Sequence, residues 1–430
     1  MNTEFISSAP EPDPEMEIRS DCIVRYLPRS SGGLDIGLES RVMVMYGRSI
    51  HRLAEQTLAE LGITHASLHI EDYGALPFVI QARIEATVKM AHPELEAVSL
   101  PELKDQARQA PWRDRFRRSR LYLPGTMPKF MLNAGIHQPD AIILDLEDSV
   151  APPEKLSARF IVRNALRTLD FFGAEPMVRI NQGNLGLEDL EAVVPQPVHV
   201  ILMPKVETAD QVQAVDEKIA GISDSCDREE PVFLMPILES AQGIVNAPAI
   251  AQASGNNVAL AIGLEDYTAD LGVQRTAEGR ESIFARSMVV NAARSAGLQA
   301  IGTVFSDVDD MEGLRSAAIE ARALGFDGMG AIHPRQIRVI HESFAPTEDE
   351  IEMAKEIVLA FDEAQAKGLG VVSLGTKMID APVVKRAQRI VDLATAMGLM
   401  PEDWKQIWAE KQDEQVHDEG SAKRAPGAGA

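Results

Sequence analysis

The sequence predicts an α/β protein built on an eight-stranded (β/α)₈ barrel of the TIM type. Two observations predict the barrel. Eight short apolar runs lie between residues 120 and 334, and helix-like segments of ten or more residues separate them. Most of the residues able to do chemistry follow the ends of these runs, where the βα loops of a barrel form its active site. The pattern therefore also predicts an enzyme.

The eight predicted strands are, in order, RLYLPG from residue 120, AIILDLED from 141, MVRIN from 177, HVILMPK from 199, PVFLMPILES from 231, VALAIGLED from 258, AIGTVFSD from 300 and FDGMGAIHP from 326. The barrel is expected to span residues 117–340. A helical extension should follow over 341–411, and a small α/β domain should precede the barrel over 18–95, joined to it by a charged, Pro-containing linker at 96–116. The two ends, 1–17 and 412–430, are polar and are expected to be disordered.

Composition excludes several classes of protein. The net charge of −23 argues against nucleic-acid binding, since phosphates would be repelled, and argues against anionic membranes. No apolar run is long enough to span a membrane, and the acidic N-terminus lacks the features of a signal peptide. The two cysteines, Cys22 and Cys226, do not form a disulfide framework, so a reducing, cytoplasmic location is expected.

Local patterns define elements at both ends of the chain. Around the turn PRSSGG, the runs DCIVRYL and LDIGLES indicate two strands and a hairpin. A helix should follow from GRSIHRL, then a half-buried strand THASLHIED and a second helix IQARIEATVKMA. Near the C-terminus, Thr347 and Glu350 have the spacing of a capping box at a helix start. The segment VVSLGTKMIDAP should be an extended loop or hairpin.

Glu239 and Asp266 are the most informative pair, because each ends a predicted strand. Two carboxylates on neighbouring strand tips can hold one Mg²⁺, which prefers oxygen ligands and keeps several waters. The alternative is that they cap helices or form salt bridges. Glu239 lies in apolar surroundings, where an unpaired carboxylate is costly.

Arg179 and Asn181 form a second predicted cluster. A guanidinium at the barrel mouth can bind a carboxylate or a developing enolate, or it can pair with Glu147 or Asp148. Both roles are compatible if these acids orient the arginine.

Among three further residues, two are open to two interpretations. Lys205 could bind a carboxylate of the substrate or pair with Glu207. His333 could be a general base, although a structural imidazole is favoured for a histidine before proline. Asp380 precedes a proline and a helix, which is typical of an N-cap.

Taken together and in order, the motifs resemble the citrate lyase β-subunit and HpcH/HpaI aldolase family, which includes malyl-CoA and citramalyl-CoA lyases. The matches are RRSRLYLPG, PDAIILDLEDSV, VRIN, MPKVE, ESAQGI, GLEDYTADLG, DMEGL, GFDGMGAIHPRQI and GTKMIDAPVVKRA. This resemblance implies that Glu239 and Asp266 bind Mg²⁺ and that Arg179 contacts the keto acid and stabilises the enolate. It also implies that Asp380 acts as acid/base from a neighbouring subunit, in a homo-trimer or hexamer with shared active sites.

For other residues the resemblance to the family is weaker. The resemblance implies that Glu147 and Asp148 support the site, and that Arg118 and Lys129 contact the thioester carrier. Met329 departs from the pattern, because the family usually has lysine there, which puts one contact to the carrier's phosphates in doubt.

The N-terminal segment resembles the small acyl-carrier (γ) subunit of citrate lyase, and the malonate decarboxylase carrier is similar over the same stretch. Such carriers bear a CoA-like prosthetic group on a serine. Ser20, directly before Asp21, is the candidate attachment position, although Arg19 stands where the modified serine is expected. The domain either carries the arm or has lost it and become structural.

The sequence thus predicts a Mg²⁺-dependent lyase that cleaves a 3-hydroxy-3-carboxyacyl thioester, such as a citryl-, malyl- or citramalyl-thioester, into a 2-keto acid and an acyl thioester. The alternatives are an aldolase acting on free hydroxy acids and a subunit that needs a partner transferase.

Overall fold

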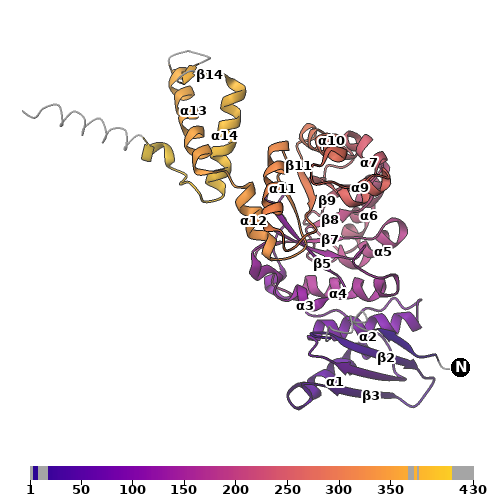
Figure 1. Ribbon diagram of the computed structural model, residues 1–430. Coiled ribbons are helices and arrows are strands. Elements are labelled where there is room, and N and C mark those ends of the chain that lie inside the picture. Colours follow the sequence, from indigo (N-terminus) through magenta and orange to yellow (C-terminus); the bar gives the residue numbers. More distant parts are fainter. Residues whose placement is uncertain (1–2, 8–17, 367–371, 375–376, 409–430) are drawn as a thin grey trace, which may run out of the picture. The chain divides into compact units, whose positions relative to one another are not determined.

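The computed structural model describes residues 3–7, 18–366, 372–374 and 377–408, and the chain divides into two compact units, residues 1–344 and 345–430 (Figure 1). The boundary lies beyond the predicted barrel end at 340. Helix α12 (Arg335–Phe344) continues past that position and buries Ile340 and Phe344 in the core of the first unit. The predicted boundary is therefore corrected by four residues.

A closed barrel of eight parallel strands forms the centre of the first unit. All eight strands match the predicted runs; they are β5 (Ser119–Pro124), β6 (Ala141–Asp145), β7 (Glu175–Arg179), β8 (Val200–Met203), β9 (Phe233–Leu238), β10 (Ala259–Ile262), β11 (Gln299–Val304) and β12 (Gly328–Ala331). The strands read as nearly continuous apolar runs because both of their faces are covered.

Helices surround the barrel. They are α3 (Pro128–Met131), α4 (Lys155–Thr168), α5 (Gly183–Val193), α6 (Ala209–Ser225), α7 (Ala241–Val245), α8 (Ala247–Ala251), α9 (Leu264–Asp270), α10 (Ile283–Ser295), α11 (Met311–Leu324) and α12. One apolar cluster lies between strands and helices, and a smaller one, including Ile143, Met177 and Leu202, fills the barrel interior. Short 3₁₀ turns occur at Asp105–Ala107, Ala134–His137, Pro152–Glu154 and Arg280–Ser282.

The N-terminal domain is a four-stranded sheet with the order β1-β2-β4-β3. Its strands are β1 (Phe5–Ser7), β2 (Cys22–Pro28), β3 (Leu34–Ser40) and β4 (Ala66–Asp72). The predicted hairpin of β2 and β3 is wrong, because β4 inserts between them, antiparallel to β2 and parallel to β3. The expectation of disorder over 1–17 fails for Phe5–Ser7, which pair with β2; residues 8–17 lie outside the described part.

Two helices accompany this sheet, α1 (Met43–Glu60) and α2 (Pro77–Ala91). Helix α2 is buried almost all round, as expected for a helix with core on two sides. Ile80 and Ile84 belong to the core of the sheet domain, whereas Val79 and Ala82 belong to the core of the barrel layer. The N-terminal domain is therefore packed onto the barrel through α2, in addition to being joined by the linker.

The second unit contains α13 (Glu348–Ala366), β13 (Val372–Leu374), β14 (Lys377–Ile379) and α14 (Ala381–Ala396). Strands β13 and β14 pair antiparallel, as the hairpin prediction requires. The predicted capping box is present: the Thr347 backbone N–H donates to Glu350 Oε2 at 2.8 Å, and the Glu350 N–H donates to Thr347 Oγ1 at 3.2 Å. The predicted disordered tail, 412–430, lies outside the described residues.

None of the helices in the described part of the chain is long and apolar enough to cross a membrane. Cys22 is buried and Cys226 is exposed, and both are free thiols.

Candidate active site

The carboxyl ends of β6 and β7 bring a carboxylate and a guanidinium together. Asp145 and Arg179 are the last residues of these strands and are register partners. Arg179 Nε donates to Asp145 Oδ1 and Arg179 Nη2 donates to Asp145 Oδ2, both at 2.7 Å. Burial raises the pKa of Asp145, but the hydrogen bonds and charge of Arg179 outweigh this and hold that pKa below its ordinary value. The pair keeps the guanidinium charged and fixed in orientation.

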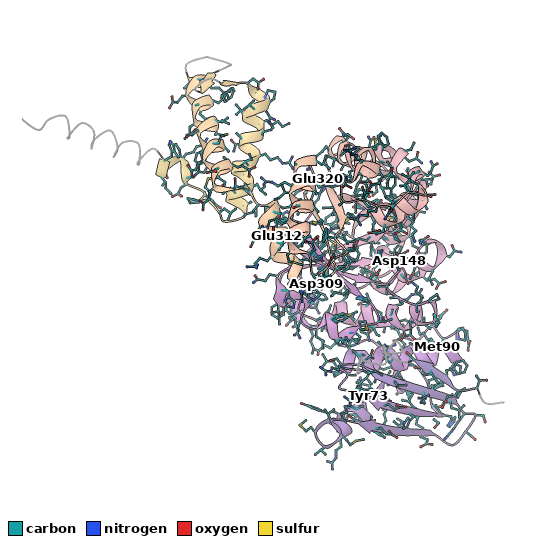
Figure 2. All side chains as sticks on the ribbon, viewed as in Figure 1. Tyr73, Met90, Asp148, Asp309, Glu312 and Glu320 are labelled. Carbon is teal, nitrogen blue, oxygen red and sulfur yellow. The ribbon has the colours of Figure 1, made fainter. Side chains whose placement is uncertain are left out.

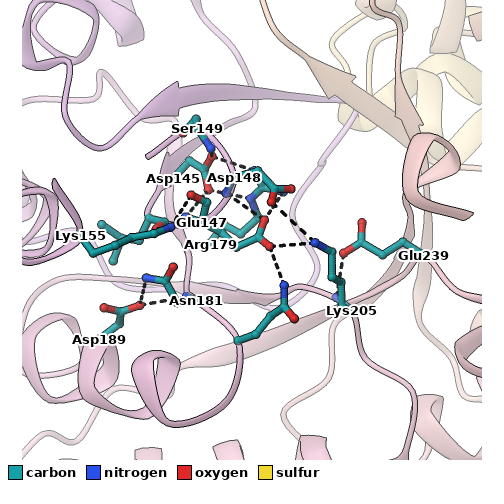
Figure 3. A network of polar contacts seen from close by, with 12 residues as sticks. Asp145, Glu147, Asp148, Ser149, Lys155, Arg179, Asn181, Asp189, Lys205 and Glu239 are labelled. Carbon is teal, nitrogen blue, oxygen red and sulfur yellow. Dashed lines mark hydrogen bonds and ion pairs between the residues drawn. The ribbon is translucent and has the colours of Figure 1, made fainter. Parts of the chain in front are cut away.

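Two more acids surround the same guanidinium, as predicted. Arg179 Nη1 lies 3.1 Å from Glu147 Oε2 and 3.5 Å from Asp148 Oδ2 (Figure 3). Glu147 is buried and also accepts a hydrogen bond from Gln182. Asp148, labelled in Figure 2, is exposed. Burial, followed by its hydrogen bond with Asp148, raises the pKa of Glu147. The structure thus brings Arg179, Glu147 and Asp148 into one network.

Lys205 links this network to the predicted metal ligands. Its ammonium lies 3.4 Å from Glu147 Oε1, 3.7 Å from Asp148 Oδ1 and 3.8 Å from Asp266 Oδ1. Of the two interpretations of Lys205, the pair with Glu207 does not form, because Glu207 accepts from Ser240 Oγ instead. Burial lowers the pKa of Lys205, but the surrounding carboxylates outweigh this and raise it, so the ammonium stays charged.

Glu239 is a buried carboxylate at the end of β9. Its Oε1 accepts the backbone N–H of Lys205 at 2.8 Å (Figure 3). Its Oε2 lies against Gly263, where a Cβ would meet that oxygen at 2.4 Å, so the close approach requires glycine. Burial raises the pKa of Glu239 to about 7, opposed by the Lys205 N–H and reinforced by Asp266 and Glu147. A buried carboxylate with this pKa lacks a full counter-charge.

Asp266 lies in the first turn of α9, and its side chain is 45% exposed. The start of this helix is held by the Leu264 N–H, which donates to Thr303 Oγ1 at 3.3 Å. The donor set of Glu239 and Asp266 fits a hard divalent ion: oxygen ligands, one of them short of positive charge. No group of three or more His, Cys, Asp or Glu side chains suited to a metal occurs in the described residues. Such an ion would therefore keep several positions for water and substrate.

A cavity of about 450 Å³ opens between these groups. The Tyr122 ring lies beneath Arg179, with its centroid 5.3 Å from Arg179 Cζ. The other residues that line the cavity include Arg120, Asp145, Asp148, Ile237, Glu239, Ala261, Asp266, Gly302 and Thr303. The cavity therefore joins a guanidinium, two carboxylates able to hold a metal, and an apolar wall.

Arg118 does not reach this cavity. It directly precedes β5, so it lies at the amino end of the barrel strands, and its Nη2 pairs with Asp140 Oδ1 at 2.8 Å. A six-residue strand is about 20 Å long. The prediction that Arg118 contacts the thioester is therefore wrong for this site. Lys129, on α3, follows the carboxyl end of β5 and so lies on the side of the barrel that holds the cavity.

Two other predicted residues have local partners. The backbone N–H and Nδ2 of Asn181 both donate to Asp189 Oδ2, so the Asn181 side chain is paired within its own loop and helix. His333 Nδ1 accepts the N–H of Arg335, in keeping with a structural role.

Asp380 and Ser20 each lie within their own part of the fold. Asp380 is exposed and caps α14, because its Oδ1 accepts the Val383 N–H at 3.2 Å. It belongs to the second unit. Ser20 precedes β2, is partly exposed and has a left-handed backbone with φ of 58°.

Sequence reasoning missed the partnership of Asp145 with Arg179 and the presence of Tyr122 and Arg120 in the cavity. A signal existed for the first, since both residues end consecutive strands. A signal also existed for the others, since Arg120 and Tyr122 alternate in one strand and so face the same side.

Comparison with known proteins decides the family. Residues 118–334 match the family described as HpcH/HpaI aldolase/citrate lyase. The chain belongs to this family. It is 43% identical to citrate lyase subunit beta of Haemophilus influenzae over 283 residues, which cover 65% of this chain and 97% of that protein. It is 35% identical to human mitochondrial citramalyl-CoA lyase over 293 residues, covering 65% and 86%. These family members are named lyases, as the sequence predicted.

One solved structure of the family shares the fold with a TM-score of 0.56. It is CitE from Mycobacterium tuberculosis in complex with magnesium, acetoacetate and coenzyme A, 31% identical, covering 66% of this chain and 99% of that one. The N-terminal residues 18–91 match a second family, described as malonate decarboxylase delta subunit (MdcD). The predicted carrier-like resemblance of this domain is thereby confirmed.

Proposed function

We propose that this protein is a Mg²⁺-dependent carbon–carbon lyase acting on a 3-hydroxy-3-carboxyacyl thioester. The observation that carries the proposal is the cavity itself, which Arg179, Glu239 and Asp266 line together at the carboxyl ends of the barrel strands. One named relative is a citrate lyase subunit and another is a citramalyl-CoA lyase, and one solved relative is in complex with magnesium, acetoacetate and coenzyme A.

Glu239 and Asp266 would hold the ion. When bound, Mg²⁺ supplies positive charge for the carboxylate and hydroxyl oxygens of the substrate. Arg179 binds the keto-acid part, and Asp145 keeps its guanidinium in place. Glu147 and Asp148 hold Nη1 of Arg179. Together with Lys205 they also balance the charge of the site.

In the cleavage, the substrate's hydroxyl gives its proton to solvent and its carbon becomes the carbonyl of the keto acid. The adjacent carbon–carbon bond breaks, and its electron pair forms the enolate of the acyl thioester. Arg179 stabilises the negative charge as a preorganised donor. Asp380 of a neighbouring subunit gives a proton to the enolate carbon, which requires a trimer or hexamer with shared sites.

Ser20 is proposed as the attachment point of a CoA-like arm. It is partly exposed, and its backbone N–H donates to the carbonyl oxygen of Tyr73 at 3.1 Å. Its neighbour Asp21 pairs with Arg83, which also pairs with Glu154 just before α4. The loop leading to α4 carries Glu147 and Asp148, so this end of the domain is on the same side of the barrel as the cavity. Intact-mass measurement tests the attachment: an added phosphoribosyl-dephospho-CoA mass supports it and an unmodified chain contradicts it.

The substrate proposal is tested by incubating the purified protein with Mg²⁺ and citryl-CoA, (S)-malyl-CoA or (S)-citramalyl-CoA, and measuring the keto acid released. Cleavage of one of the three is expected. Folded, metal-loaded protein that cleaves none of them contradicts action on free CoA thioesters and favours a carrier-bound substrate made by a partner transferase. A cytoplasmic location is also proposed, supported by the free, exposed thiol of Cys226.

A further inference from the structure

Arg120 is a buried cation at the floor of the cavity. It is 2% exposed. The described residues include four other buried arginines, namely Arg83, Arg117, Arg159 and Arg163. Each of those has a carboxylate oxygen at 2.7 or 2.8 Å. Arg120 has no ion pair in the described part of the chain, so it differs from all of them.

Arg120 interacts with the hydroxyl of the neighbouring Tyr122, and its other contacts are weak. Its Nη1 lies 3.1 Å from the sulfur of Met235, and its Nη2 lies 3.4 Å from the carbonyl oxygen of Gly302. Its Nε is buried and has no hydrogen-bond partner among the described residues. A guanidinium has five N–H donors, and a thioether is a poor acceptor. Most of its hydrogen-bonding capacity is therefore unused, which is costly for a buried charge.

The unused capacity lies where a substrate would bind. Arg120 lines the same cavity as Arg179 and Glu239. Ala261 and Gly302, which have small or no side chains, also line it and leave space beside the guanidinium. Burial lowers the pKa of Arg120, opposed by the neighbouring Tyr122, which agrees with a cation that awaits an anion.

We propose that Arg120 is a specificity-determining residue that binds a second carboxylate on the keto-acid part of the substrate. This inference rests on the proposed function, in which Arg179 and the metal ligands engage the first carboxylate. The three candidate thioesters differ at this position: malyl has hydrogen, citramalyl has methyl and citryl has carboxymethyl. A planar, buried guanidinium suits the carboxylate of the third and gains nothing from the other two.

The test measures keto-acid binding, so it does not depend on turnover. The affinities of oxaloacetate, 2-oxobutyrate and pyruvate are measured by calorimetry with saturating Mg²⁺. Oxaloacetate and 2-oxobutyrate share the same carbon chain, but 2-oxobutyrate has a methyl group in place of the second carboxylate. The wild-type protein is expected to bind oxaloacetate about 10- to 100-fold more tightly than 2-oxobutyrate, the range for hydrogen bonds to a charged group.

Arg120→Met should abolish this preference and leave pyruvate binding within about twofold, because the methionine removes charge and keeps an extended side chain. Arg120→Lys should retain part of the preference. Arg25→Met, at a surface pair with Glu71, is the control and should change none of the affinities. If Arg120→Met does not fold, Arg120→Gln is measured in its place, with the same expectation.

Two results would overturn the inference alone: equal wild-type affinity for oxaloacetate and 2-oxobutyrate, or an equal loss of all three keto acids in Arg120→Met, which would indicate a structural role. Failure of the wild-type, Mg²⁺-loaded protein to bind any keto acid would instead overturn the proposed function, and the inference with it.

Discussion

The backbone N–H of Lys205 donates to Oε1 of Glu239 at 2.8 Å, and the backbone of Lys205 is left-handed, with φ of 50°. This conformation is uncommon for a residue other than glycine, and such positions gather at functional sites. One residue thus contacts both proposed metal ligands: its backbone holds Glu239, and its ammonium lies 3.8 Å from Asp266.

Magnesium affinity should depend on pH through Glu239. The pKa of this carboxyl is raised to about 7, and a ligand must be ionised to bind metal. Below pH 7, the dissociation constant for Mg²⁺ should rise about tenfold per pH unit, and above pH 7 it should level off. Calorimetric titration between pH 5.5 and 8.5 checks this. A dissociation constant that does not vary with pH would count against the assignment.

The stability of the metal-free protein should fall as pH rises, whereas its affinity for Mg²⁺ should rise. The folded pKa of Glu239 is raised from 4.5 to about 7, so between these values the folded state binds more protons than the unfolded state. The free energy of unfolding should therefore fall as pH rises from 4.5 to 7, by about 3 kcal/mol in total. Urea unfolding across this range should show the fall in wild type. The part of this fall that comes from the Glu239 carboxyl should be missing in Glu239→Gln. Identical pH profiles of the unfolding free energy in wild type and Glu239→Gln would contradict the prediction.

Arg179→Lys should reduce cleavage about 100- to 1,000-fold, because an ammonium cannot reproduce the two-pronged contact with Asp145 and also reach the substrate. Arg179→Met should also be less stable by about 3–5 kcal/mol, since Asp145 would remain buried without its partner. Steady-state kinetics and urea unfolding check the two effects. Wild-type activity in Arg179→Lys would remove this residue from the mechanism.

Asp380→Asn separates the two roles of Asp380. Asparagine caps helices as well as aspartate does, so the thermal stability should not change, whereas Asp380→Ala should cost about 1 kcal/mol. Neither variant can act as an acid, so both should stop exchange of the acyl thioester's α-protons. The exchange is followed by NMR in deuterated water. Wild-type exchange in Asp380→Asn would leave only the capping role.

Arg83→Met should loosen the N-terminal domain from the barrel. Arg83 is fully buried and donates to Asp21 and to Ser157 at 2.8 Å each. Its removal leaves Asp21 buried and unpaired, so we expect a loss of about 3–5 kcal/mol and faster proteolysis in the segment 92–116. Arg25→Met is the control. Unchanged proteolysis in Arg83→Met would show that the docking does not depend on this arginine.

The barrel could be predicted from the sequence because parallel strands covered on both faces leave long apolar runs, and because Glu239, Asp266 and Arg179 each end one of them. The pairing of β2 with β4 could not be predicted. Local turn residues favour a hairpin of β2 and β3, and they do not show that a strand distant in sequence lies between these two. The placement of Arg118 failed because a residue at the start of a strand lies at the opposite end of the barrel from its carboxyl end.

The role of Arg120 was also out of reach. A sequence shows that an arginine interrupts an apolar strand, but it does not show whether a carboxylate lies opposite. Arg117, three residues earlier, has such a partner in Glu175, with Nε and Oε2 2.7 Å apart. The difference between a structural and a functional buried arginine depends on contacts more than 50 residues away in the chain.

The most direct test of the account is Mg²⁺-dependent cleavage of citryl-CoA, (S)-malyl-CoA and (S)-citramalyl-CoA by wild type, Glu239→Gln and the surface control Glu191→Gln. The account predicts that wild type and Glu191→Gln cleave one of these thioesters only with Mg²⁺, and that Glu239→Gln, folded and equally stable or more so at pH 7, loses this activity. Full Mg²⁺-dependent cleavage by Glu239→Gln would contradict the central claim.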